Sequence, residues 1–204
     1  MRPGLLRRDA LKQLTAAPLA AGLAWTAAEA DTARKRANVA RREAVAAQTT
    51  YAPQFFTGDE YATLSALVEM ILPADDRSGG AADAGVPEFI DFMMIDQPTQ
   101  QDALRGGLAW LDVECQRRFD RRFTVCDAVQ RGAVLEDIAW PDRAPASLSQ
   151  GVGFFSNVRD LTATGFWTSQ IGIEDLQYLG NRYRVAWRGC PPDALDRLGV
   201  RYDD

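Results

Sequence analysis

Apolar residues recur at helical spacing along most of the chain, and strand-like alternation is almost absent. The first stripe follows Thr57, which stands three residues before Glu60 as in a capping box, and Pro73 ends it. Its apolar positions are Tyr61, Leu64, Leu67, Val68, Ile71 and Leu72. Intervals of three and four residues place these side chains on one face, so the pattern predicts an amphipathic helix.

Four more helices are predicted downstream, each from a start signal or an apolar stripe. Pro87 suits the first turn of the second helix. Thr99 and Asp127 are predicted to cap the third and fourth helices, and either Ser147 or Ser149 the fifth. The stripes of the second, third and fifth helices are Phe89, Ile90, Met93 and Met94; Leu104, Leu108, Leu111, Cys115 and Phe119; and Phe154, Phe155, Val158, Leu161, Thr162 and Phe166.

Helical periodicity stops at Ser169, and the remainder is predicted to be extended or looped, with a helical turn or two from Asp193 to Leu198. Aromatic residues gather around this segment: Phe166, Trp167, Tyr178, Tyr183, Trp187 and Tyr202. They either anchor an interface or cover the open end of the bundle. The sequence therefore predicts an all-α fold, a single small helical bundle of about five helices with an irregular, aromatic-rich C-terminal arm.

The first 30 residues have the layout of a twin-arginine signal peptide. Arg7 and Arg8, followed by Leu11 and Lys12, keep four positions of the consensus for that export route. The apolar stretch that follows is too short to span a bilayer, which takes about 20 residues. An ordinary secretory signal that contains two arginines by chance is the alternative.

Small residues at Ala28 and Ala30 predict cleavage by signal peptidase before Asp31. The twin-arginine route carries proteins that have already folded, usually around a cofactor. The leader therefore indicates a protein whose export is tied to a folded, cofactor-containing cargo.

Two segments follow the leader. Residues 31–52 are rich in alanine and arginine and are predicted to be a basic linker or a loosely held helix. Residues 53–204 have the length of one domain. The net charge of −5 over the 204 residues argues against a nucleic acid as partner.

No catalytic, cofactor-binding or metal-binding site is predicted in this chain. The sequence contains no histidine, which removes the commonest general base and metal ligand. The acidic loop with Asp75, Asp76 and Asp83 lacks the alternating ligands and closing glutamate of a calcium loop. A stand-alone hydrolase that works with two carboxylates remains the enzymatic alternative.

Three cysteines, Cys115, Cys126 and Cys190, are an odd number for a protein exported to an oxidising compartment. At least one of them is then free or bonded to another chain, unless all three act as small buried hydrophobes. Cys115 lies on an apolar stripe and is expected to be buried. Cys190 precedes Pro191-Pro192 in the irregular arm and is expected to face a partner.

Several blocks of the sequence resemble the gluconate 2-dehydrogenase subunit 3 family. The most specific is Gly165-Phe166-Trp167-Thr168-Ser169-Gln170-Ile171-Gly172-Ile173-Glu174-Asp175-Leu176, followed by Tyr178-Leu179-Gly180-Asn181 and Trp187-Arg188-Gly189-Cys190-Pro191. The others are Phe56-Thr57-Gly58-Asp59-Glu60 with Ile71-Leu72-Pro73-Ala74-Asp75, and Asp83-Ala84-Gly85-Val86-Pro87-Glu88-Phe89-Ile90-Asp91. The resemblance extends over roughly residues 53–200. Gln170 departs from it, since a basic residue is often found there.

The resemblance implies a non-catalytic small subunit of a membrane-associated, FAD-dependent dehydrogenase of sugars, sugar acids or polyols. The FAD lies in a large partner of the glucose–methanol–choline (GMC) type, and a multi-haem cytochrome c subunit with haem c often takes the electrons. The small subunit supports folding of the large one and lends it the twin-arginine leader. We therefore expect a periplasmic protein that meets the membrane only through its complex.

Two alternatives stay open. The partner of this chain is a glycoside 3-dehydrogenase, or the chain is a stand-alone periplasmic binding module. If the chain is the small subunit of a dehydrogenase of either kind, the residues expected to contact the large partner are Trp167, Tyr178, Asn181, Trp187 and Cys190.

Overall fold

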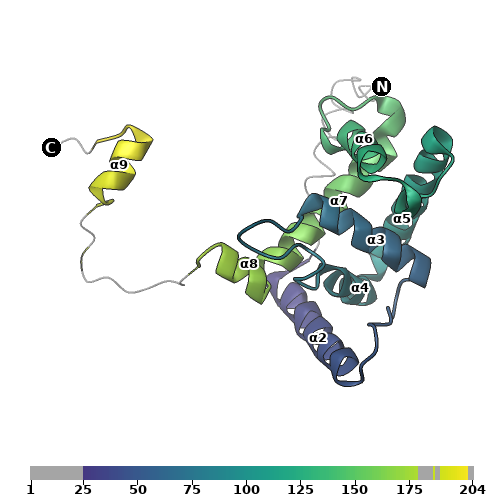
Figure 1. Cartoon of the computed structure of the whole chain (residues 1–204), viewed down its shortest axis with the longest axis horizontal. Coiled ribbons are helices and arrows are strands. Elements are labelled where there is room, and N and C mark those ends of the chain that lie inside the picture. Colours follow the sequence, from purple (N-terminus) through teal and green to yellow (C-terminus); the bar gives the residue numbers. More distant parts are fainter. Residues whose placement is uncertain (1–24, 179–185, 187–188, 202–204) are drawn as a thin grey trace, which may run out of the picture.

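The computed structural model describes residues 25–178, 186 and 189–201, and within them the chain is all-α, as predicted. It has eight α-helices in these residues rather than about five, and no strand. The helices are α2 (Ala27–Ala46), α3 (Gly58–Ile71), α4 (Val86–Asp96), α5 (Pro98–Phe119), α6 (Ala128–Ala139), α7 (Ser149–Trp167), α8 (Gln170–Asp175) and α9 (Pro192–Leu198), with 3-10 turns at η1 (Phe123–Val125) and η2 (Ala146–Leu148). Figure 1 shows α2 to α8 gathered in one body and α9 standing apart from it.

Helix α4 is the centre of this body. All nine residues from Val86 to Met94 are buried, and the helix contacts α2, α3, α5 and α7. A helix that is apolar on nearly every side has to be enclosed by its neighbours. Helix α7 crosses the same core and contacts α2, α3, α4, α5, α6 and α8.

Two glycines allow the close approaches around α4. Gly85 precedes the helix with φ of 76°, a left-handed conformation that residues with a Cβ rarely adopt, and Arg41 of α2 packs directly against it. Gly165 of α7 lies over the Phe89 ring, so that a Cβ there would be 2.7 Å from Phe89 Cδ1. Both glycines fall in blocks on which the family resemblance rests.

Several predicted helix starts are confirmed and others are corrected. Thr57 and Asp127 cap α3 and α6, as predicted, and each of them forms a capping box. Thr99 does not cap the third predicted helix, because α5 starts one residue earlier, at Pro98, whose ring fixes the helical φ without a side-chain cap. The fifth predicted helix, α7, starts at Ser149 and continues from η2, so no serine side chain caps it.

The segment directly after Ser169 is helical, whereas the sequence predicted an extended or looped segment. The Ser169 hydroxyl accepts a hydrogen bond from the Gly172 amide at 3.0 Å and starts the short helix α8. Gly172 is buried against the end of α7. A six-residue helix is too short to produce a recognisable apolar period.

The basic segment 31–52, predicted to be a linker or a loosely held helix, is helical over most of its length and packs against the core. Helix α2 begins upstream of it, at Ala27, and buries Ala30, Ala33 and Ala37, which are spaced by three and four residues. Small side chains let its backbone lie close along α4, as Figure 1 shows. The packed body therefore begins well before residue 53.

Two arginines of α2 pair with groups on and beside α4. Arg36 Nη1 lies 2.7 Å from Asp96 Oδ1, and its guanidinium covers the Phe92 ring at 4.7 Å. Arg41 lies 3.5 Å from Glu88 and donates to the Asp83 carbonyl. The charges of α2 thus complement acidic groups on and beside α4.

Asp91 of α4 is a fully buried carboxylate that holds the connection between α2 and α3. Its two oxygens accept hydrogen bonds from the Tyr51 hydroxyl at 2.6 Å and from three successive backbone amides at 2.7–3.0 Å, those of Gln54, Phe55 and Phe56. Burial, and next the hydrogen bond to Asp91, raises the pKa of Tyr51, so the phenol stays a donor. Because Asp91 accepts hydrogen bonds from the amides of this connection, they need no partners in a helix or a strand.

We predict that Asp91→Asn lowers the free energy of unfolding by about 3 kcal/mol, because one amide oxygen cannot replace two carboxylate oxygens and the amide NH₂ faces other donors. Tyr51→Phe removes one of the four hydrogen bonds and is expected to cost about 1 kcal/mol. Urea unfolding of both variants measures this order. An Asp91→Asn variant as stable as Tyr51→Phe would contradict the assigned role.

A second buried carboxylate, Glu114, joins α5 to α6 through arginine. It accepts from Arg117 at 2.7 and 2.9 Å and from Arg118 at 2.6 Å, while Arg118 also reaches Asp137 of α6 at 2.6 Å. The hydrogen bonds from Arg117, and next those from Arg118, lower the pKa of Glu114 from 4.5 to about 2, against the opposing effect of burial.

Because the pKa of Glu114 is lower in the folded chain, its stabilisation is complete above pH 4.5 and disappears as the pH falls towards 2. We predict that Glu114→Gln has a lower free energy of unfolding than the unchanged chain at pH 7. This difference should shrink as the pH falls from 4.5 towards 2. Urea midpoints from pH 7 to pH 2.5 measure it. Asp142→Asn, at an exposed carboxylate, is the control, and its urea midpoint should follow that of the unchanged chain at every pH.

Candidate partner interface

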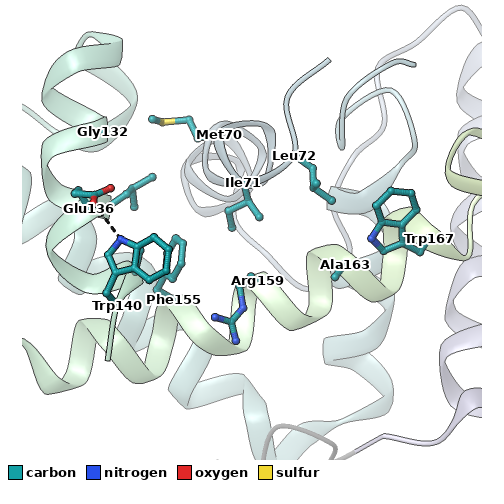
Figure 2. Close-up of a pocket in the computed structure, with 12 residues that line it drawn as sticks. Met70, Ile71, Leu72, Gly132, Glu136, Trp140, Phe155, Arg159, Ala163 and Trp167 are labelled. Carbon is teal, nitrogen blue, oxygen red and sulfur yellow. Dashed lines mark hydrogen bonds between the residues drawn. The ribbon is translucent and has the colours of Figure 1, made fainter. Parts of the chain in front are cut away.

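An apolar hollow of about 500 Å³ lies where the end of α3 meets α6 and α7. Met70, Ile71 and Leu72 form one wall, and Figure 2 shows them above α7. The remaining lining residues are Gly132, Leu135, Glu136, Ala139 and Trp140 from α6 and its end, and Phe155, Arg159, Ala163 and Trp167 from α7. Mostly apolar walls with a few polar groups are typical of a binding surface.

Two tryptophans stand at opposite ends of this hollow, with Arg159 between them (Figure 2). Trp140 is 51% exposed, and its indole Nε1 donates to Glu136 at 3.0 Å, which orients the ring. Trp167 is 36% exposed, and its ring stands edge-on against buried Phe166 at a centroid distance of 4.9 Å. Both indoles are thus held in place while a large apolar area faces solvent.

A second hollow, of about 470 Å³, shares Trp167 with the first. Its walls come from the start of α2, the end of α7 and the region of α8: Trp25, Ala27, Ala30, Asp31, Arg34, Thr164, Trp167, Thr168, Ile173 and Tyr178. Arg34 joins two of these walls, since it donates to the Thr168 carbonyl and pairs with Asp31. Trp167 therefore lines both hollows.

The structure brings together two of the five residues predicted to contact a partner. Trp167 and Tyr178 line the second hollow. Cys190 is half-buried and lies just before α9, with no lining role in either hollow. Asn181 and Trp187 lie outside the described residues, as do Arg7, Arg8, Leu11 and Lys12 of the leader. The interface role of all five residues stays a prediction.

Trp140 was missed by sequence reasoning. Its position before Pro141 indicates the end of a helix but does not predict which residues lie around it in the fold. Only the packing of α6 against α7 gives it a place in the hollow, although an exposed tryptophan beside a proline break is a signal that can be searched for.

Cys115 and Cys126 are both buried, as expected for Cys115. Burial, and next the neighbouring Cys126 thiol, raises the pKa of Cys115 to about 12. The two thiols therefore meet in the core and lie away from both hollows.

The described residues contain no group of three or more acidic or cysteine side chains placed to hold a metal ion. Over the same part of the chain, none of the helices has the length and apolar character needed to cross a membrane.

Comparison with known families gives one match. A family model described as gluconate 2-dehydrogenase subunit 3 matches residues 58–186. No curated protein and no solved structure matches the chain. The matched stretch begins at the first residue of α3 and contains every residue that lines the first hollow, whereas α2 lies before it.

Proposed function

The chain belongs to the gluconate 2-dehydrogenase subunit 3 family, and from this premise we propose that it is the non-catalytic small subunit of an FAD-dependent dehydrogenase complex. The family name describes a subunit of a dehydrogenase, and the match covers more than half of the chain. The observation that supports a subunit role for this protein is the pair of apolar hollows that meet at Trp167, with Trp140 at the far end.

The proposed partner is a large GMC-type flavoprotein that covers the first hollow. Trp140 and Trp167 become buried on binding and act as anchors, since large rigid aromatic rings lose little conformational entropy and exclude much water. Glu136 and Arg159 line the same hollow and can pair with polar groups of the partner around this apolar contact. Binding by this route needs no rearrangement of α3, α6 or α7.

The chemistry of the complex is assigned to the partner. FAD in the large subunit accepts the electrons of the substrate, and haem c in a multi-haem cytochrome subunit takes them onward. This chain stabilises the flavoprotein and brings it to the periplasm, with the twin-arginine leader serving both subunits. The complex meets the membrane through the cytochrome subunit.

We predict that Arg7→Lys with Arg8→Lys leaves dye-linked dehydrogenase activity of the flavoprotein in the cytoplasm. The partner travels with this leader, so loss of the arginine pair retains both chains. The measurement is activity in periplasmic and cytoplasmic fractions of cells that express both subunits. Arg2→Lys, which changes an arginine outside the pair, is the control and should leave export unchanged.

A flavoprotein that reaches the periplasm with the double variant would remove the shared-leader part of the proposal. Full periplasmic activity in cells that lack this chain altogether would remove the proposal as a whole.

We predict that Trp140→Ala weakens association with the flavoprotein by roughly 30-fold, as expected for a central aromatic anchor, and that Trp167→Ala does the same. Val129→Ala, at an 82% exposed position of the same helix α6 but outside the hollow, should have no effect. Binding is measured by titration of the purified flavoprotein, and thermal unfolding shows that each variant is folded. Trp140→Ala with unchanged affinity would exclude the first hollow as the contact.

A further inference from the structure

The two small residues that predict cleavage before Asp31 lie inside a formed helix. Ala28 and Ala30 belong to the first turn of α2, which starts with a capping box. The Thr26 hydroxyl accepts from the Glu29 amide, and the Glu29 carboxylate accepts from the Thr26 amide. The Ala30 amide donates to the Thr26 carbonyl at 3.1 Å.

The same turn is also held by contacts to distant parts of the chain. Ala30 is 5% exposed and belongs to the core, and Trp25 packs against that core from the residue before the cap. Glu29 Oε1 accepts a hydrogen bond from Gln97 Nε2 at 3.0 Å, which ties the turn to the start of α5. Cleavage after Ala30 would remove the cap, the Trp25 contact and this hydrogen bond together.

A peptidase binds its substrate as an extended strand, through main-chain hydrogen bonds that a helix has already used. Before the bond between Ala30 and Asp31 can enter an active site, the first turns of α2 have to unwind and expose Ala30 and Ala33. The rate of cutting then falls with the small population of the opened form. Since the proposed export route delivers a folded chain, α2 is already formed when the peptidase meets it; this step rests on the proposed function.

We propose that residues 25–30 belong to the mature domain and that signal peptidase cuts immediately before Trp25. The sequence Gly22-Leu23-Ala24 provides small residues at the two positions that the enzyme recognises. Water adds across the peptide bond between Ala24 and Trp25 and leaves a carboxylate on Ala24 and an amine on Trp25. The new amino terminus then lies one residue before the Thr26 cap and leaves α2 whole.

The test is the amino terminus of the chain recovered from the periplasm of cells that make the whole complex, determined by intact mass and by terminal sequencing. Trp25 is the expected first residue. A chain that begins at Asp31, or one that keeps its leader in the periplasm, overturns the inference. A full-length chain that stays in the cytoplasm contradicts the proposed export route, not the cleavage position. In that case the purified full-length chain is cut with purified signal peptidase in detergent, and the position of the cut is determined directly.

Two substitutions in the full-length chain separate the cleavage positions. Ala28→Glu places a large charged residue where cleavage after Ala30 requires a small one, but Ala28 is exposed and an acidic residue suits the first turn of a helix. This variant should be processed at the normal rate. Ala24→Leu should abolish the Trp25 terminus. Blocked processing in Ala28→Glu, together with normal processing in Ala24→Leu, overturns the inference.

Discussion

One buried carboxylate sets the arrangement of the first half of the fold. Asp91 sits in the middle of α4, and its four hydrogen bonds fix the irregular connection that leads from α2 to α3. With that connection fixed, α2 lies along one side of α4 and α3 along another, and the acidic groups of α4 meet the arginines of α2. A buried carboxylate is tolerated here because both of its oxygens are hydrogen-bonded, and it also pairs the buried amide of Phe56, which would be costly to leave without an acceptor.

The sequence predicted those helices that have a local start signal or an apolar stripe. Thr57 with Glu60 specifies a capping box within four residues, Asp127 specifies a cap, and the structure has both caps. Helix α2 gave no such stripe, because alanine counts weakly as a hydrophobe and its burial depends on α4, which starts 40 residues after α2 ends. The arginines that suggested a solvated segment in fact find their partners only after the chain has folded.

The candidate interface was predictable only in part, for a similar reason. The group of aromatic residues from the end of α7 onward pointed to Trp167 and Tyr178, and these two line one hollow. The first hollow is lined by residues that lie far apart in the sequence, such as Leu72 after α3, Trp140 after α6 and Trp167 at the end of α7. Composition and periodicity describe each helix alone, whereas a concave surface is a property of how three helices pack together.

The position of Trp167 also has a geometric consequence. Its ring packs edge-on against Phe166 and lines both hollows, one together with residues of α3 and α6 and the other together with residues of α2 and α8. The two hollows are therefore neighbours that share one indole. A single molecule that fills both has to pass over this ring, so its contact surface needs two protrusions with a recess between them that receives the indole.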